Sequence, residues 1–241
     1  MANSGGARGR SGARRPSGTP RPARSAAPRR KPAAPAATPA AKREPPRSFT
    51  LGVVPGATPG KWISAWRERM PHVELVLRPL AFADQGAVLA SGELDAALVR
   101  LPLDGDDLHV IRLYDEVPVA IVSADSHLTA ADELDLADLS GEVVIVPADD
   151  VLGVHVPGGI APAFDAPLDT EQAVETVATG VGVAIVPMSL ARLHARKDVA
   201  ARPVRDAPVS TVALAWPRET TTPDVDTFVG IVRGRTAHSS R

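Results

Sequence analysis

Residues 49–70 read FTLGVVPGATPGKWISAWRERM, and this stretch sets the pattern for the rest of the chain. Its first six residues are an apolar run of the length of a buried strand, and Pro55–Gly60 is rich in turn-forming residues. Apolar side chains then recur at positions 62, 63, 66 and 70, the spacing of one helix face. Thr58 suits the N-cap of that helix and Pro59 its first position. The stretch therefore predicts a strand, a turn and a helix that ends at Met70.

The same alternation of strands and helices continues toward the C-terminus. We expect further strands or extended segments at Val73–Leu80, Asp95–Arg100, Leu108–Val122, Val143–Val146, Gly182–Pro187 and Thr211–Trp216. We expect helices at Asp84–Ser91, Leu136–Leu139, Thr170–Gly180, Ser189–Arg196 and Asp224–Arg233. Such alternation favours right-handed crossovers and a mostly parallel sheet. The predicted strands and helices amount to two small α/β lobes. A cleft between two such lobes suits ligand capture by hinge closure.

Residues 1–48 differ sharply from this folded part. They consist mainly of Ala, Pro, Arg, Gly and Ser, and they carry twelve basic residues against one acid, Glu44. Their net charge is +11, which leaves −12 for the rest of a chain with a total of −1. Few large apolar side chains are present to offset the ordering entropy, so we expect a disordered basic tail at 1–48 and a short disordered C-terminus at 236–241. The Arg clusters predict weak, non-specific nucleic-acid contact through residues 1–47.

Several classes of protein are disfavoured by what the sequence lacks. The chain has no cysteine and no apolar run long enough for a signal peptide or a bilayer span, so we expect a cytoplasmic protein without membrane association. Its six histidines show no metal-ligand spacing, and no G-x-S-x-G motif is present. The acidic residues Asp104, Asp106 and Asp107 suit a solvated turn. We therefore expect no metal, no cofactor and no enzymatic activity.

Two features are candidates for binding a small anion. The run Gly56-Ala57-Thr58-Pro59-Gly60-Lys61 fails as a phosphate-binding P-loop because only three residues separate Gly56 from the Gly-Lys pair. A turn into a helix N-terminus still favours an anion such as a carboxylate, although an ordinary capped turn explains it equally well. Arg100 ends a predicted strand, where ligands of open α/β sheets bind, but its spacing also permits a surface ion pair with Glu93 or Asp95.

Two further positions belong to the second predicted lobe. Thr170 opens a predicted helix after Asp169, so it either faces the cleft or only caps the helix. Pro187 ends the predicted strand at 182–187, where it could line the wall of the cleft.

Taken in order, several segments resemble the effector-binding domain of LysR-type transcriptional regulators. The segments are the opening strand and helix, Gly92-Glu-Leu-Asp-Ala-Ala-Leu-Val-Arg100, Pro118–Val122 with His127-Leu128, Leu136–Leu139, and Val174-Glu-Thr-Val-Ala-Thr-Gly-Val-Gly-Val-Ala-Ile-Val-Pro187. The match covers about residues 49–234. It departs from the family's usual His-Pro-Leu run, because His127-Leu128 is followed by Thr129 and the proline is absent. The family also normally begins with a helix-turn-helix and a linker helix, which residues 1–48 do not resemble.

The resemblance implies a periplasmic-binding-protein-like fold of type 2, with two Rossmann-like lobes and a central cleft. Lobe I would comprise residues 49–121 and 210–235, and lobe II residues 122–209. Effectors of the family bind between the lobes, which implies these ligand-binding residues here: Gly56, Ala57, Thr58, Pro59, Arg100, Leu101, Pro102, Thr170 and Pro187.

The sequence therefore predicts a regulatory domain that senses a small, anionic metabolite. Its expected partners are that effector, such as a carboxylate, and a second copy or another LysR-type protein. A nucleic-acid-associated protein that uses the basic tail is the alternative from a different class. An enzyme on a two-lobed fold is a third, for which no cleft carboxylate stands out in the sequence.

Overall fold

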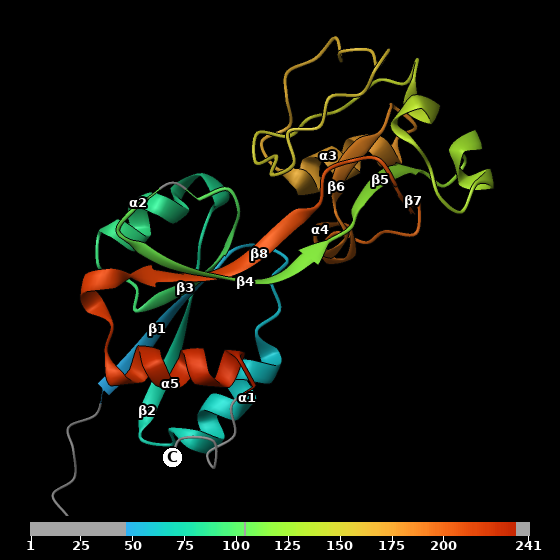
Figure 1. The fold of residues 1–241 in the computed structure, drawn as a ribbon. Helices are drawn as coiled ribbons and strands as arrows, with labels where there is room; N and C mark the ends of the chain where they lie inside the picture. The colour runs from blue at the N-terminus through green and yellow to red at the C-terminus, as the bar shows by residue number, and fades with distance from the viewer. Residues whose placement is uncertain (1–46, 104, 235–241) are drawn as a thin grey trace, which may run out of the picture. The chain divides into compact units, whose positions relative to one another are not determined.

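The computed structural model describes residues 47–103 and 105–234, and it arranges them around two β-sheets (Figure 1). The predicted disordered tail lies outside the described residues except for Arg47 and Ser48, which already belong to the first strand. The predicted disordered C-terminus at 236–241 also lies outside them.

The first sheet has five strands in the order β2-β1-β3-β8-β4. Their bounds are β1 (Arg47–Val53), β2 (Val73–Pro79), β3 (Ala96–Arg100), β4 (Leu108–Glu116) and β8 (Ser210–Pro217). Strand β1 runs parallel to β2 and β3, whereas β8 runs antiparallel to β3 and β4. The prediction of a mostly parallel sheet is therefore wrong beyond the first three strands. The reason is that β8 returns from the second sheet and enters between β3 and β4 in the opposite direction.

Helices cover both faces of the first sheet (Figure 1). They are α1 (Gly60–Arg69), α2 (Gln85–Ala90) and α5 (Pro223–Val232), with 3-10 turns η1 (Phe82–Asp84) and η4 (Arg218–Thr220). Helices α1 and α5 share one face, where the ring centroid of Phe49 lies 4.7 Å from that of Trp66 and 5.1 Å from that of Phe228. Helix α2 buries Leu89 on the other face.

The second sheet has three strands in the order β6-β5-β7, and both of its pairings are antiparallel. Its elements are β5 (Pro118–Ser123), β6 (Ala184–Pro187), β7 (Val199–Pro203), α3 (Thr170–Ala178), α4 (Met188–Leu193), and the 3-10 turns η2 (His127–Ala130) and η3 (Leu136–Leu139). The strand predicted at Val143–Val146 is absent, because that segment makes only single bridges, Val143 with Ile160 and Val144 with Val183. Strand β7 was not expected from the sequence.

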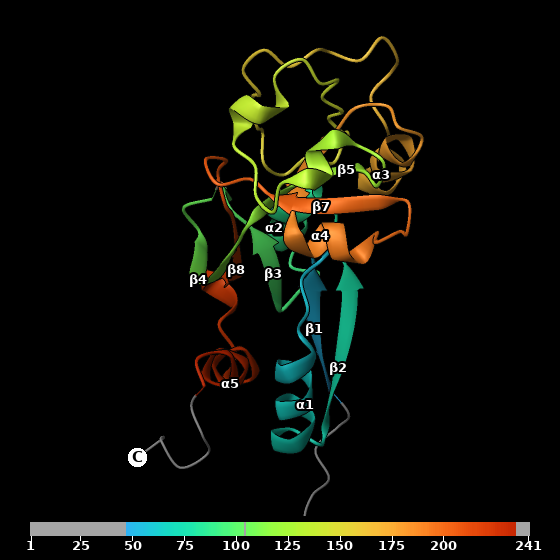
Figure 2. The same ribbon diagram turned by 90° about the vertical axis from the view of Figure 1, so that its right-hand side faces the viewer.

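Two short connections join the sheets. Val117 alone separates β4 from β5, and residues 204–209 separate β7 from β8. All of β5 pairs within the second sheet, so the sheets divide at Val117, a few residues before the predicted boundary between 121 and 122. Figure 2 shows β5 and β7 on one side of this division and the first sheet on the other.

Candidate functional site

A cavity of about 810 Å³ lies where the two sheets meet. The first sheet contributes the turn after β1 and the end of β4, and the second contributes helix α4 and the end of β7. The lining residues are Gly56, Ala57, Thr58, Tyr114, Asp115, Glu116, Val117, Glu133, Met188, Ser189, Arg192, Leu193 and Pro203. The volume falls within the range of small-molecule pockets, and the lining mixes apolar with polar side chains, as such pockets do.

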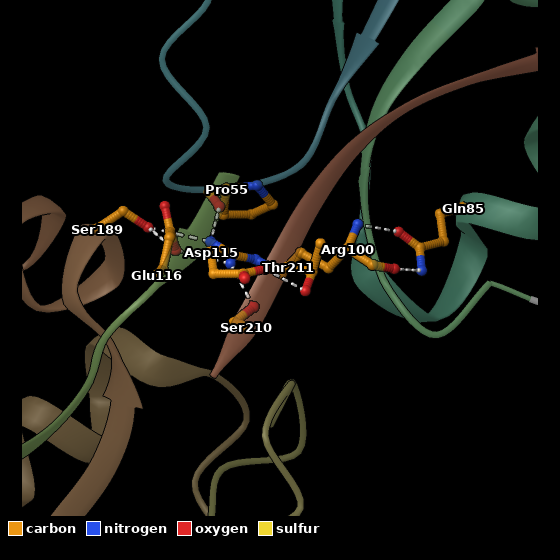
Figure 3. A network of polar contacts seen from close by, with 8 residues as sticks. All are labelled: Pro55, Gln85, Arg100, Asp115, Glu116, Ser189, Ser210 and Thr211. Atoms are coloured by element: carbon orange, nitrogen blue, oxygen red, sulfur yellow. Dashed lines mark hydrogen bonds and ion pairs between the residues drawn. The ribbon is translucent and has the colours of Figure 1, made fainter. Parts of the chain in front are cut away.

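Glu116 of the lining forms a buried ion pair with Arg100, which lies behind it (Figure 3). The Arg100 side chain is 1% exposed, and its Nη1 donates at 2.8 Å to Glu116 Oε2 and at 2.7 Å to Ser210 Oγ. Its Nη2 donates at 3.1 Å to the Pro55 carbonyl and at 3.0 Å to Ser189 Oγ. A buried charge is tolerated when it is paired and its hydrogen bonds are satisfied, and this guanidinium meets both conditions.

The backbone of Arg100 is held separately by a buried glutamine. Gln85 Oε1 accepts a hydrogen bond from the Arg100 amide at 3.0 Å, and Gln85 Nε2 donates to the Arg100 carbonyl at 2.7 Å. Helix α2 therefore fixes the end of β3 through both backbone groups of one residue, which limits where the guanidinium can reach.

Ser189 joins the second sheet's side of the cavity to this ion pair. It lies in the first turn of α4, donates through Oγ to Glu116 Oε2 at 2.8 Å and accepts from Arg100. Gly56 packs against the same group: a Cβ there would lie 2.4 Å from Ser189 Oγ and 3.1 Å from Arg100 Nη2. The first sheet's turn, its buried ion pair and helix α4 thus meet at one point.

Each of the three acidic lining residues forms an ion pair with an arginine outside the lining. Asp115 pairs with Arg112 at 3.3 Å, Glu116 with Arg100, and Glu133 with Arg205 at 4.0 Å. Arg192 is the single cation of the lining, and it makes no hydrogen bond or ion pair with any residue in 47–103 or 105–234. The cavity therefore keeps one positive charge available for a ligand.

The pKa values of two lining residues, Tyr114 and Asp115, are shifted from their ordinary values. Burial and the neighbouring Glu116 carboxylate raise the pKa of Tyr114, while Arg100 and the Thr58 backbone oppose this effect. The hydrogen bond from Thr211 lowers the pKa of Asp115, with further help from Arg112. Near neutral pH the lining thus holds the neutral phenol of Tyr114 and the ionised carboxylate of Asp115.

Three of the nine predicted ligand-binding residues line the cavity, namely Gly56, Ala57 and Thr58. Thr58 is not the N-cap, because Pro59 takes that place and the first helical residue is Gly60. Pro59 has a helical φ of −76° but a ψ of 6°, so the helix starts one residue later than expected. Pro59 is buried and does not line the cavity.

The other predicted residues lie outside the lining. Arg100 is buried by its own partners, and neither predicted partner is paired with it, since Glu93 pairs with Arg78 and Asp95 accepts from the Thr50 amide. Leu101 and Pro102 follow β3, joined by a cis peptide bond, and neither lines the cavity.

The two candidates from the second lobe, Thr170 and Pro187, contact other residues of that lobe and do not line the cavity. Thr170 is 1% exposed and donates to Asp149 at 2.9 Å, while Asp169 caps the helix by accepting from the Gln172 amide. Pro187 is buried opposite Pro118 in β5. Here the lining begins at the next residue, Met188.

Most of the lining residues that the sequence did not reveal come from two places. Tyr114, Asp115 and Glu116 end β4 and Val117 follows it, inside a stretch that was expected to be one continuous extended segment. Pro118 was the available signal, because proline interrupts ladder hydrogen bonding and here it opens a strand of the other sheet. Ser189, Arg192 and Leu193 lie on a helix that was predicted, but nothing in its spacing points to a cavity.

Residues 47–103 and 105–234 contain no cluster of three or more His, Cys, Asp or Glu side chains placed to hold a metal ion. In the same ranges no helix has the length and apolarity needed to cross a bilayer.

Comparison with known proteins identifies the family. The family model described as the LysR substrate binding domain matches residues 42–237. The chain is similar to the Hca operon transcriptional activator HcaR of Escherichia coli, with 28% identity over 209 residues, which is 79% of this chain and 69% of that protein. It is also similar to the HTH-type regulator CatR of Pseudomonas putida, with 31% identity over 137 residues, which is 53% of this chain and 47% of that protein.

Solved structures confirm the fold. The reduced regulatory domain of OxyR from Pseudomonas aeruginosa superposes with a TM-score of 0.62 at 21% identity, covering 79% of this chain and 96% of that one. The BenM effector-binding domain with its effector benzoate gives a TM-score of 0.65 at 17% identity, covering 80% and 93%. The predicted periplasmic-binding-protein-like fold is thus confirmed. The chain belongs to the family of LysR substrate-binding domains, the small-molecule-binding part of a class of transcriptional regulators.

Proposed function

We propose that the cavity between the two sheets binds a small anionic metabolite and that its occupancy changes how the lobes close on each other. Arg192 is the observation that carries this proposal: it lines the cavity, it has no partner among the described residues, and the three lining acids each face another arginine. A guanidinium with free N–H donors matches a carboxylate well. The turn at Gly56–Thr58 adds backbone groups on the opposite lobe.

Transmission to lobe closure follows from the way the cavity is built. A ligand that touches residues of both lobes binds the closed arrangement more tightly than an open one and so shifts the population toward it. Because Val117 and residues 204–209 are the two connections between the sheets, closure requires changes at few backbone positions. The output is proposed to be regulatory and intracellular, as for a protein that controls transcription.

A thermal-shift screen of the full chain with small aliphatic and aromatic carboxylates tests the proposal. A ligand of the folded state raises Tm with the logarithm of its concentration, equivalent to about 2.7 kcal/mol at a hundred times Kd. Arg192→Gln should weaken the best acid by about tenfold or more, since a charge-assisted hydrogen bond contributes about 1.5–3 kcal/mol. Arg67→Gln is the matched control, because Arg67 is exposed on α1 away from the cavity. Equal binding by wild type and Arg192→Gln would contradict the proposed site.

We further propose that the domain pairs with a second copy or with another LysR-type domain. The edge strand β2 exposes Val76 at 39% and Leu77 at 47%, and apolar side chains on an open sheet edge favour association. Light scattering at increasing concentration would then show a mass above the monomer's 25.1 kDa, and Leu77→Lys would reduce it.

A second candidate function is nucleic-acid contact through the basic segment at 1–47. Its charge supports this candidate, because cationic segments bind phosphate backbones in a salt-dependent way. Binding of the full chain to duplex DNA should fall steeply with salt, and replacement of Arg14, Arg15, Arg29 and Arg30 by Gln should flatten that slope. An absence of binding at low salt would discard the candidate.

A further inference from the structure

Among the residues that the structure describes, none donates a hydrogen bond to one oxygen of the Glu116 carboxylate. Glu116 is 9% exposed and lines the cavity. Both donors that reach its carboxylate, Arg100 Nη1 and Ser189 Oγ, bind the same atom, Oε2, each at 2.8 Å. Within the described residues nothing donates to Oε1, and Figure 3 shows that oxygen without a dashed line.

The donors nearest to this oxygen, on Arg100 and Ser189, already make hydrogen bonds to other atoms. Arg100 uses both terminal nitrogens on Glu116, Ser210, Pro55 and Ser189. Ser189 has a single hydroxyl proton, and it goes to Oε2. Tyr114 lines the same cavity, but among the described residues no hydrogen bond joins its hydroxyl to Glu116.

This oxygen is open to the cavity, since the described residues contain no buried side-chain oxygen that lacks a hydrogen-bond partner. A ligand that supplies a donor there forms a hydrogen bond to a charged group, which contributes about 1.5–3 kcal/mol. A ligand without one gains nothing there and removes any water that served the oxygen. The cavity thus offers a free acceptor at Glu116 and a free cationic donor at Arg192.

We propose that the ligand carries a hydrogen-bond donor, a hydroxyl or ammonium group, that binds Glu116 Oε1, in addition to the anionic group that binds Arg192. The ligand class is then a hydroxy acid or an amino acid in the broad sense, and plain carboxylic acids are discriminated against. This inference rests on the proposed function of the cavity. Sites built to bond a ligand hydroxyl reject the analogue that lacks it more strongly than apolar pockets reject a missing methylene.

Calorimetric titration of the full chain with matched acids tests the inference. The probes are straight-chain carboxylates of about four to eight carbon atoms whose far end is a methyl, a hydroxyl or an ammonium group, together with benzoate, 3-hydroxybenzoate and 4-hydroxybenzoate. At the length that spans the cavity, a donor-bearing probe should bind at least about tenfold more tightly than its plain counterpart. Equal binding within every matched set overturns the inference, because water would then satisfy Oε1, and leaves the proposed function standing. Absence of binding by every acid overturns the proposed function and this inference with it.

Glu116→Gln sharpens the test because it exchanges one acceptor for a donor. Arg100 and Ser189 both donate to Oε2, so the amide oxygen should take that place and the amide nitrogen should face the cavity. The preference for donor-bearing probes should then disappear, and a preference that persists unchanged overturns the inference. Glu93→Gln is the control, since it also removes an Arg–Glu ion pair but on the surface, with Arg78. If Glu116→Gln does not fold, the matched probes on the wild-type chain decide alone.

Discussion

The hydroxyl of Ser189 donates at 2.8 Å to the carboxylate of Glu116, and this hydrogen bond joins helix α4 of the second lobe to strand β4 of the first. Glu116 is in turn paired with Arg100, so the contact between the lobes rests on a buried charge pair of the first sheet. A hydrogen bond to a charged group contributes about 1.5–3 kcal/mol, twice the value of a neutral one. Ser189 is therefore suited to favour the closed arrangement.

Ser189→Ala should loosen the lobes without removing the ion pair. Both hydrogen bonds of the hydroxyl, to Glu116 and from Arg100, are lost. Small-angle scattering should show a larger radius of gyration, and amide exchange should rise around Val117 and residues 204–209. Ser210→Ala is the matched control, because Ser210 also bonds Arg100 but lies in the same sheet. Equal expansion in the two variants would contradict a specific role for Ser189.

Gly56→Ala should disturb the same contact from the other side. Gly56 has a φ of +82°, and an added Cβ would lie 2.4 Å from Ser189 Oγ. Gly141→Ala separates this clash from backbone strain, since Gly141 has a φ of +84° and open space around its Cβ position. Backbone strain should lower the free energy of unfolding of both variants by about 1 kcal/mol. In chemical denaturation Gly56→Ala should show the larger decrease. Equal losses would mean that Ser189 moves aside freely.

Arg100→Met should be far more destabilising than the loss of a surface ion pair. It leaves Glu116 buried without its counter-charge, which is unfavourable by about 3–5 kcal/mol. Arg78→Met is the comparison, since Arg78 and Glu93 are 46% and 52% exposed and such pairs contribute about 0–1 kcal/mol. Urea denaturation of the two variants measures the difference, and similar midpoints would show that the Arg100 site relaxes around the loss.

The sequence predicted the elements whose apolar side chains recur with a clear period. Trp66 and Phe228 fall on the expected inward faces of their helices, and both contact Phe49 of the first strand. Strand β7 was missed because Val199–Pro203 is at best half-buried and carries Arg202, so it has no apolar run to detect. Local periodicity therefore finds buried elements and overlooks an edge strand.

The partners of Arg100 could not be predicted from local spacing. Glu93 and Asp95 are its near neighbours in the chain, whereas Ser189 and Ser210 are separated from it by 89 and 110 residues. Those contacts depend on the return of β8 into the first sheet and on the docking of α4, both set by long-range packing. Arg100 was predicted to face the ligand, whereas its guanidinium supports residues of the cavity wall and does not line the cavity.

Tyr114 allows the cavity to be followed by its titration, because it is the only tyrosine of the chain. Burial, with the Glu116 carboxylate beside it, raises the pKa of Tyr114 above its ordinary 10.0, so the tyrosinate absorbance of the folded protein should appear at higher pH than that of the protein in urea. The raised pKa means that the folded state holds this proton more tightly. The associated stability is complete below the unfolded pKa and is lost as pH rises through the folded one. Glu116→Gln removes a cause of the shift and should lower the midpoint, and an anion bound at Arg192 should raise it. A midpoint equal in folded and unfolded protein would show that the phenol is solvated and that the cavity is more open than the contacts around Thr58 indicate.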